Sequence, residues 1–205
     1  MHFSIITAMQ NRTAALVVLP SILGLLGLGV VAQTTVPRQS PKAVAERFCR
    51  MESDGKHLTP DGWREMTKLL ISSTAKPRLE EMAVIKDFVV SDPVIEGNEA
   101  KVIVQYTTLG ILDARNLTFG PRGMDPEKIT FERTLVLTGK YAQVEPNGVV
   151  KEMEGPLEWR IEGQAEPHIS VQTAIRYLQQ LRTKTSNNTL KRSADESLVA
   201  LQKLQ

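Results

Sequence analysis

The apolar residues of this chain change their spacing twice, and this change restricts the fold more than any other feature. Up to about residue 71 they recur every three or four positions, as on one face of a helix; from about residue 84 to 161 they form short runs with β-type alternation. After Ser170 the helical spacing returns. This order predicts an α+β fold, with N-terminal helices packed on a curved antiparallel sheet and C-terminal helices after it.

Two helices are predicted before the sheet. Ser40 followed by Pro41, and Thr59 followed by Pro60, are residue pairs favoured at the N-cap and first position of a helix. The first helix is expected to stop near residues 54–55, where an Asp-Gly pair breaks the pattern. The apolar faces are Val44, Phe48 and Met51 in the first helix and Trp63, Met66 and Leu70 in the second.

Four strands are predicted, over residues 84–91, 101–112, 129–139 and 157–161. The third has apolar residues at odd positions, and the fourth alternates Leu157, Trp159 and Ile161 with charged residues, so each should bury one face. Turns are expected at 96–98 and 146–148, and the Gly- and Pro-rich stretch 116–127 is expected to be a surface loop.

The C-terminal part is predicted to hold two more helices. The first begins near Ser170 and carries an apolar stripe that could pack back on the sheet or on a partner. After a polar break at 185–189, Ser193 and Glu196 have the spacing of a capping box and indicate where a short terminal helix starts. The stripe of the first helix comprises Val171, Ala174, Ile175, Leu178 and Leu181.

The first 32 residues are typical of an export signal. Arg12 precedes an uncharged stretch, residues 14–32, whose last part is purely aliphatic and glycine and ends in Ala32, so cleavage would leave Gln33 as the mature N-terminus. The alternative is an uncleaved membrane anchor, because the apolar segment approaches the length of a transmembrane helix. We therefore expect an exported protein, periplasmic or secreted.

The predicted organisation is a signal peptide over 1–32, a flexible leader over 33–40, an α+β domain over 41–166 and a C-terminal helical extension over 167–205. Loss of Arg12 with the signal lowers the formal charge from +2 to +1. A chain so close to neutral lacks the basic face expected of a nucleic-acid-binding protein. The lone Cys49 cannot form an internal disulfide, so it is expected to be a small buried residue or to pair with a second chain.

Two phrases of the sequence, together with the order of its elements, resemble the nuclear-transport-factor-2-like superfamily. These are Leu-Thr-Pro-Asp-Gly-Trp at 58–63 and Leu-Glu-Trp-Arg-Ile at 157–161, and the similarity spans roughly residues 41–166. The resemblance implies a cone, in which a bent sheet wraps the helices and leaves a pocket at its open end. Some members use that pocket for isomerase or dehydratase chemistry, and many use it only for binding, so the resemblance implies a fold more than a reaction.

Arg133 is the most unusual residue of the predicted sheet, because it falls in the apolar series of its strand. A buried guanidinium needs an anion, which could be the carboxylate of a ligand or a nearby glutamate; a bulge or snorkelling would expose it instead. Tyr106, Trp159 and Asp87 are the other candidate ligand-binding residues. The predicted function is that of an exported binding or interaction module, whose partner is a small apolar or anionic molecule or a second copy of the chain.

The alternative is a pocket enzyme of isomerase or dehydratase type. The resemblance implies a titratable pair in the pocket, for which Asp87 or Asp113 could be the base and Tyr106 the donor. Phe48 and Cys49 stand where a phenol or imidazole would be wanted, which disfavours catalysis. The sequence has no glycine-rich phosphate loop, nucleophile elbow or zinc motif, so no cofactor or metal is predicted.

Overall fold

The computed structural model describes residues 39–71, 77–121, 125–145, 147–163 and 167–205. They belong to one unit of the chain, Thr35–Gln205. The predicted signal or anchor and nearly all of the leader lie outside the described residues. Among the helices that are described, none is long and apolar enough to cross a membrane.

The two N-terminal helices begin where their capping residues predict. The side chain of Ser40 accepts a hydrogen bond from the Ala43 amide at 3.2 Å and starts α1 (Pro41–Ser53). After a 3₁₀ turn, η1 (Lys56–Leu58), the Thr59 side chain caps α2 (Pro60–Thr67) in the same way. The predicted start of both helices, and the end of the first, are confirmed.

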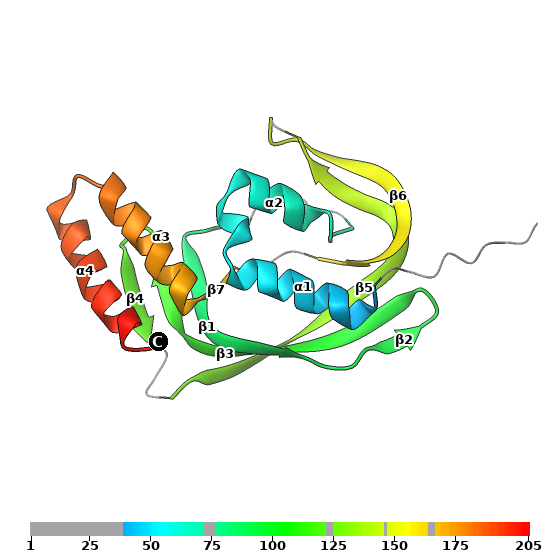
Figure 1. The fold of residues 1–205 in the computed structure, drawn as a ribbon, viewed down its shortest axis with the longest axis horizontal. Helices are drawn as coiled ribbons and strands as arrows, with labels where there is room; N and C mark the ends of the chain where they lie inside the picture. The colour runs from blue at the N-terminus through cyan, green and yellow to red at the C-terminus, as the bar shows by residue number, and fades with distance from the viewer. Residues whose placement is uncertain (1–38, 72–76, 122–124, 146, 164–166) are drawn as a thin grey trace, which may run out of the picture. The chain divides into compact units, whose positions relative to one another are not determined.

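The strands form one largely antiparallel sheet in the order β6-β5-β3-β1-β7, shown in Figure 1. Among the described strands, the short pair between β1 and β7 is parallel and the other pairs are antiparallel. Two further short strands, β2 and β4, pair with β3. The bounds are β1 (Glu81–Val90), β2 (Val94–Glu96), β3 (Glu99–Asp113), β4 (Thr118–Pro121), β5 (Glu127–Val144), β6 (Val150–Ile161) and β7 (His168–Ser170).

The pair β5–β6 is a long ribbon that bends sharply around α2 (Figure 1). At the bend, Gly139 alone stands opposite residues 155–157 of β6. A Cβ on Gly139 would come within 3.0 Å of the Gly155 carbonyl oxygen, so the two strands approach closely there. The chain after α2 then bridges both arms of the ribbon, because Leu69 accepts from the Ile161 amide at 2.8 Å and Leu70 from the Ala142 amide at 3.1 Å.

This bend corrects the predicted burial of the last strand. Trp159 and Ile161 are buried as expected, but Leu157 lies in the irregular stretch of β6 and is 41% exposed. Arg160, expected on the wet face, is only 4% exposed because its guanidinium lies over the Tyr141 ring at 4.8 Å and donates to the Lys68 carbonyl. Period-two reasoning failed at this point because it assumes a flat strand with one solvated face.

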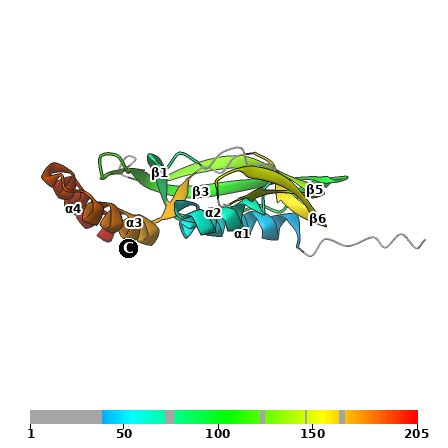
Figure 2. The same cartoon turned by 90° about the horizontal axis from the view of Figure 1, so that it is seen from above.

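Two separate hydrophobic cores pack against the sheet. The first core lies between α1, α2 and the strands, and Figure 2 shows both helices on the same side of the strands. The second core packs α3 (Val171–Lys184) and α4 (Asn188–Gln202) against the start of β1, β4 and β7. Val84 belongs to the second core and its neighbour Ile85 to the first; the pairing of β1 with β3 is irregular between these two residues, so β1 serves both cores.

The C-terminal helices pack on their own domain rather than presenting a free apolar stripe. The Ser197 hydroxyl on α4 accepts from the Phe119 amide at 2.9 Å and donates to the Leu117 carbonyl at 3.2 Å, which attaches the helix to β4. The strand β4 falls in the stretch predicted as a loop, so that prediction was wrong for Thr118–Pro121. The sequence pattern missed this strand because glycine and proline, which favour turns, lie within it and after it. Its pairing with β3 stabilises it.

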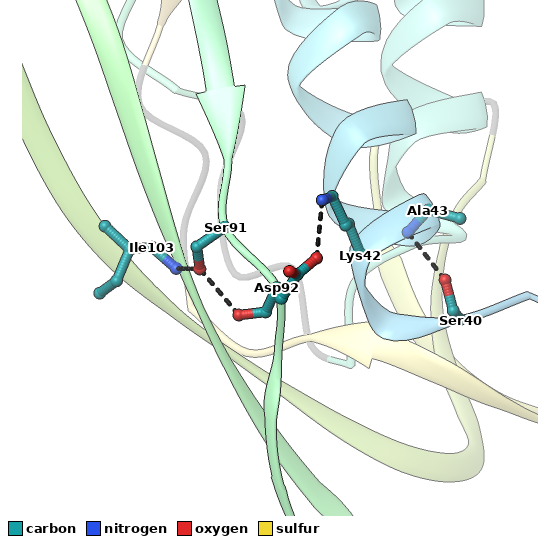
Figure 3. A network of polar contacts seen from close by, with 6 residues as sticks. All are labelled: Ser40, Lys42, Ala43, Ser91, Asp92 and Ile103. Atoms are coloured by element: carbon teal, nitrogen blue, oxygen red, sulfur yellow. Dashed lines mark hydrogen bonds and ion pairs between the residues drawn. The ribbon is translucent and has the colours of Figure 1, made fainter.

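At the opposite end of the sheet, a polar network holds the start of α1 (Figure 3). Lys42 forms an ion pair with Asp92 at 2.8 Å, beyond the end of β1. The Ser91 hydroxyl accepts from the Ile103 amide on β3 and donates to the Asp92 carbonyl, both at 2.9 Å. The Asp92 side chain is 92% exposed, so this network aligns the helix start but contributes little stability.

The terminal helix starts five residues before its predicted capping box. The Asn187 side chain accepts from the amides of Thr189 and Leu190 at 2.8 and 3.3 Å, whereas Ser193 lies inside α4. We predict that Asn187→Ala lowers the free energy of unfolding by about 1 kcal/mol because two amides lose their acceptor. Ser193→Ala should change it by less than ~0.5 kcal/mol. Urea denaturation would measure both, and equal effects of the two variants would contradict this cap.

Candidate functional site

A group of polar side chains is buried in the first core, between α1 and the inner faces of β3 and β5. It consists of Cys49 and Glu52 from α1, Tyr106 from β3 and Arg133 from β5, and is called the inner cluster below. Cys49 and Glu52 are three positions apart and therefore share one face of the helix. Tyr106 and Arg133 point inward in register with the apolar residues of their strands. None of the four is more than 7% exposed.

The inner cluster is centred on the carboxylate of Glu52. The Tyr106 hydroxyl donates to Glu52 Oε2 at 3.1 Å, and Arg133 Nη2 lies 3.8 Å from the same oxygen. The Cys49 sulfur contacts the Tyr106 hydroxyl at 3.3 Å, and the Arg133 guanidinium lies 5.3 Å from the centre of the Phe48 ring. The cluster is therefore a charge pair with a phenol and a thiol attached to it.

The position of Arg133 agrees with one alternative from the sequence analysis, a pairing with a nearby glutamate. Its side chain is buried beside a glutamate of its own chain, so its charge is compensated without a ligand. Burial opposes the charge of Arg133, but the Glu52 carboxylate outweighs it and holds the pKa of the guanidinium above its usual range. Arg133 thus contributes an internal ion pair to the first core.

Neither the phenol nor the thiol of the inner cluster is activated. Burial raises the pKa of the Tyr106 hydroxyl far above its usual value, and the negative charge of Glu52 adds to the effect. Burial likewise raises the pKa of the Cys49 thiol to about 11. Both groups are protonated at neutral pH, and a protonated thiol is a poor nucleophile. Cys49 is buried, as the first of the two sequence interpretations expected, with no surface from which to pair with a second chain.

An aromatic stack connects the inner cluster to a hollow at the edge of the first core. The His168 ring on β7 lies parallel to the Tyr106 ring, with 3.8 Å between centroids, and the Phe131 ring meets His168 edge-on at 5.6 Å. Beyond them is a hollow of about 260 Å³, called the His168 hollow below. It is lined by Glu81, Met82, Ala83, Ile111, Ile129, Phe131, Pro167 and His168.

The aspartates predicted as bases are not brought to Tyr106. Asp87 is exposed on β1. The Asp113 carboxylate accepts from the amides of Arg115 and Asn116, at 2.8 and 3.1 Å, so it organises the turn between β3 and β4. The acid that Tyr106 contacts is Glu52. The predicted pairing of an Asp base with a Tyr donor is therefore absent from the described residues.

Trp159 lies away from the inner cluster, at another part of the first core. It is 7% exposed and lines a hollow with Val44, Arg47 and Leu69, between α1 and β6. The four predicted ligand-binding residues thus separate. Tyr106 and Arg133 are together in the interior, Trp159 borders a different hollow, and Asp87 is on the surface.

Sequence analysis did not propose Glu52 or His168 as site residues, and only Glu52 could have been recognised from the sequence pattern. Glu52 follows Phe48 by four positions, so helical periodicity places it on the buried face of α1, where an acid could meet Arg133. His168 stands in a strand of three residues, too short for a period to be seen. In the described part of the chain, no group of three or more His, Cys, Asp or Glu residues is placed to hold a metal ion.

Comparisons with known proteins add nothing to this geometry. No family model matches the chain, and no curated protein or solved structure matches it either. The resemblance to the nuclear-transport-factor-2-like superfamily therefore remains a prediction, while the α+β architecture with its helices on a largely antiparallel sheet is a property of the structure.

The inner cluster predicts a strong coupling between Arg133 and Glu52. Arg133→Met should lower the free energy of unfolding by ~3 kcal/mol, because it leaves the Glu52 carboxylate buried without its cation. Adding Glu52→Leu to this variant should recover most of that loss, since the pair is then replaced by apolar volume. Urea denaturation of the two single variants and the double variant would measure the coupling.

A matched control is the exposed pair Lys140–Glu152, whose atoms are 2.9 Å apart. Lys140→Met should change the free energy of unfolding by less than ~1 kcal/mol because both side chains are more than half exposed. Additive effects of Arg133→Met and Glu52→Leu would show that the pair has no special role in the first core.

Proposed function

We propose that this chain is an exported binding module that takes a small, mainly apolar molecule in the His168 hollow. The observation that carries the proposal is the position of this hollow. Its apolar wall ends on the His168–Tyr106 stack, so a ligand would contact aromatic faces backed by a fixed polar interior. Binding pockets for small molecules commonly combine apolar walls with a few polar groups in this way.

The size and lining of the hollow define the ligand class. A volume of about 260 Å³ accommodates a molecule of one or two rings, since an engineered apolar cavity of ~150 Å³ holds benzene. Met82, Ile129 and Phe131 supply apolar contacts, while the exposed Glu81 offers a carboxylate. We therefore expect a compact ligand with one hydrogen-bonding group.

Catalysis is the less favoured alternative. Tyr106 donates its hydroxyl to Glu52 inside the core, and the pKa of that hydroxyl is raised, so it is unsuited to exchange protons with a substrate at neutral pH. The exposed Asp87 has no contact with it. A pair of this kind supports packing and binding better than it supports proton transfer.

A bulky side chain that fills the His168 hollow should prevent ligand binding. We predict that Ile129→Trp weakens binding of the neutral two-ring fluorophore 1-aminonaphthalene by tenfold or more, because the indole occupies the volume beside Phe131. Fluorescence enhancement on titration measures this affinity. Ile103→Trp is the matched control, since Ile103 lies on the neighbouring strand, is 39% exposed and does not line the hollow. Failure of the unmodified protein to bind, or unchanged binding by a folded Ile129→Trp variant, would refute the proposal.

The export part of the proposal is tested at the N-terminus. If residues 1–32 are a signal peptide, the protein purified from an exporting host through a C-terminal tag should begin at Gln33, because the segment ends in a small-residue cleavage site. Intact-mass spectrometry gives the answer directly. An uncleaved chain beginning at Met1 in the membrane fraction would instead establish the anchor.

A further inference from the structure

Two adjoining hollows lie between α1, the end of α2 and β6, at a distance along the sheet from β7 and the His168 hollow. Their volumes are about 190 and 290 Å³, and both are lined by Arg47, Leu69 and Glu158. Trp159 lines the first, while Lys68, Tyr141 and Arg160 line the second. Together they are called the α2–β6 groove below.

The α2–β6 groove carries more positive than negative charge. Its lining includes three cations, Arg47, Lys68 and Arg160, and a single carboxylate, Glu158. Glu158 is committed to Arg160, whose Nη2 donates to its Oε2 at 3.2 Å. The groove therefore has an excess of positive charge to offer an incoming anion.

Arg47 and Lys68 are the two cations of the groove that are exposed and only weakly paired, or not paired, with a described carboxylate. Arg47 lies 3.9 Å from Glu65, which also pairs with Lys56 at 3.8 Å, and these side chains are all about half exposed. Such pairs are weak and exchange readily with a ligand. Lys68 is exposed and has no carboxylate within 4.0 Å among the residues that the structure describes. Both side chains reach the groove from its helical wall.

Arg160 forms a fixed basic floor under this wall. Its guanidinium donates to the Lys68 carbonyl, lies 4.8 Å from the centre of the Tyr141 ring and is 4% exposed. Its Nε is buried and has no hydrogen-bond acceptor among the described residues. Burial lowers the pKa of Arg160 in spite of the neighbouring Glu158 carboxylate. An anion in the groove would place an acceptor near this buried guanidinium.

Apart from Gln39, the remaining lining of the groove is aromatic or apolar. Trp159 and Leu69, both 7% exposed, line the first hollow with Val44, and Tyr141 lines the second. We propose that the α2–β6 groove binds a small carboxylate that carries a flat apolar body, with the carboxylate between Arg47 and Lys68 and the body against Leu69 and Trp159. This site is independent of the His168 hollow.

The proposal can be tested by the fluorescence of Trp159 with benzoate as the probe. The chain has two tryptophans, so Trp63→Phe leaves Trp159 as the only one. Benzoate should change its emission saturably, whereas neutral benzamide should bind at least tenfold more weakly because it lacks the charge. Raising NaCl from about 0.05 to 0.5 M should weaken benzoate binding severalfold, since exposed charges are screened. If Trp63→Phe does not fold, titration calorimetry of the unmodified protein gives the same comparison.

Variants localise the site and separate it from non-specific attraction. Arg47→Gln combined with Lys68→Gln should weaken benzoate binding about tenfold, while Lys86→Gln combined with Lys101→Gln, which removes the same charge from strands outside the groove, should not. Inorganic phosphate should compete weakly, because it lacks the apolar body. Equal binding of benzoate and benzamide, equal effects of the two double variants, or the absence of a saturable change would each overturn the proposal. The fluorophore titration of Ile129→Trp is unaffected by any of these outcomes, so the two sites stand or fall separately.

Discussion

The buried pairing of Arg133 with Glu52 is the constraint on which the first core depends. Arg133 lies on the inner face of β5, where only an anion makes a guanidinium tolerable, and α1 supplies that anion from a single position. This requirement sets the rotation of α1 about its axis and its position along the sheet, because a small shift would strand two charges in an apolar interior. Tyr106 then adds a hydrogen bond to the same carboxylate. An apolar core could be more stable, but it would orient the helix less strictly.

The rest of the architecture follows from a sheet that bends and is irregularly paired at two places. Irregular pairing between β1 and β3 lets Val84 and Ile85 serve different cores, so one sheet supports the N-terminal helices and the C-terminal pair separately. At the other side, Gly139 and Gly155 allow the β5–β6 ribbon to bend until the chain after α2 joins both of its arms. The His168 hollow lies at the edge of the first core near β7, and the α2–β6 groove lies beside the bent β5–β6 ribbon. One is mainly apolar and the other is basic, which is why they are expected to take different ligands.

Capping residues and apolar spacing predicted most helices and strands correctly, but they did not predict which side chains these elements bring together. Ser40 and Thr59 cap the helices that they were expected to cap, because a capping hydrogen bond closes within three residues of chain. The capping box at Ser193 did not start α4, since the preceding Asn187 satisfies the helix amides first. Arg133 was identified as anomalous from the alternation of β5, but its partner was not, although the spacing from Phe48 to Glu52 contained that information. Asp87 was proposed for chemistry that its exposed position on β1 does not support.

The sequence by itself determined the order of helices and strands, the caps of α1 and α2, and the presence of one charged residue on a buried strand face. These are consequences of periodicity and of hydrogen bonds between near neighbours, which a linear sequence contains. Only the tertiary structure decided that Glu52 neutralises Arg133, that His168 stacks on Tyr106, and that Arg160 is covered rather than solvated. Each of these contacts joins residues more than 60 positions apart or depends on the bend of a ribbon, and no local pattern encodes the distance between such groups.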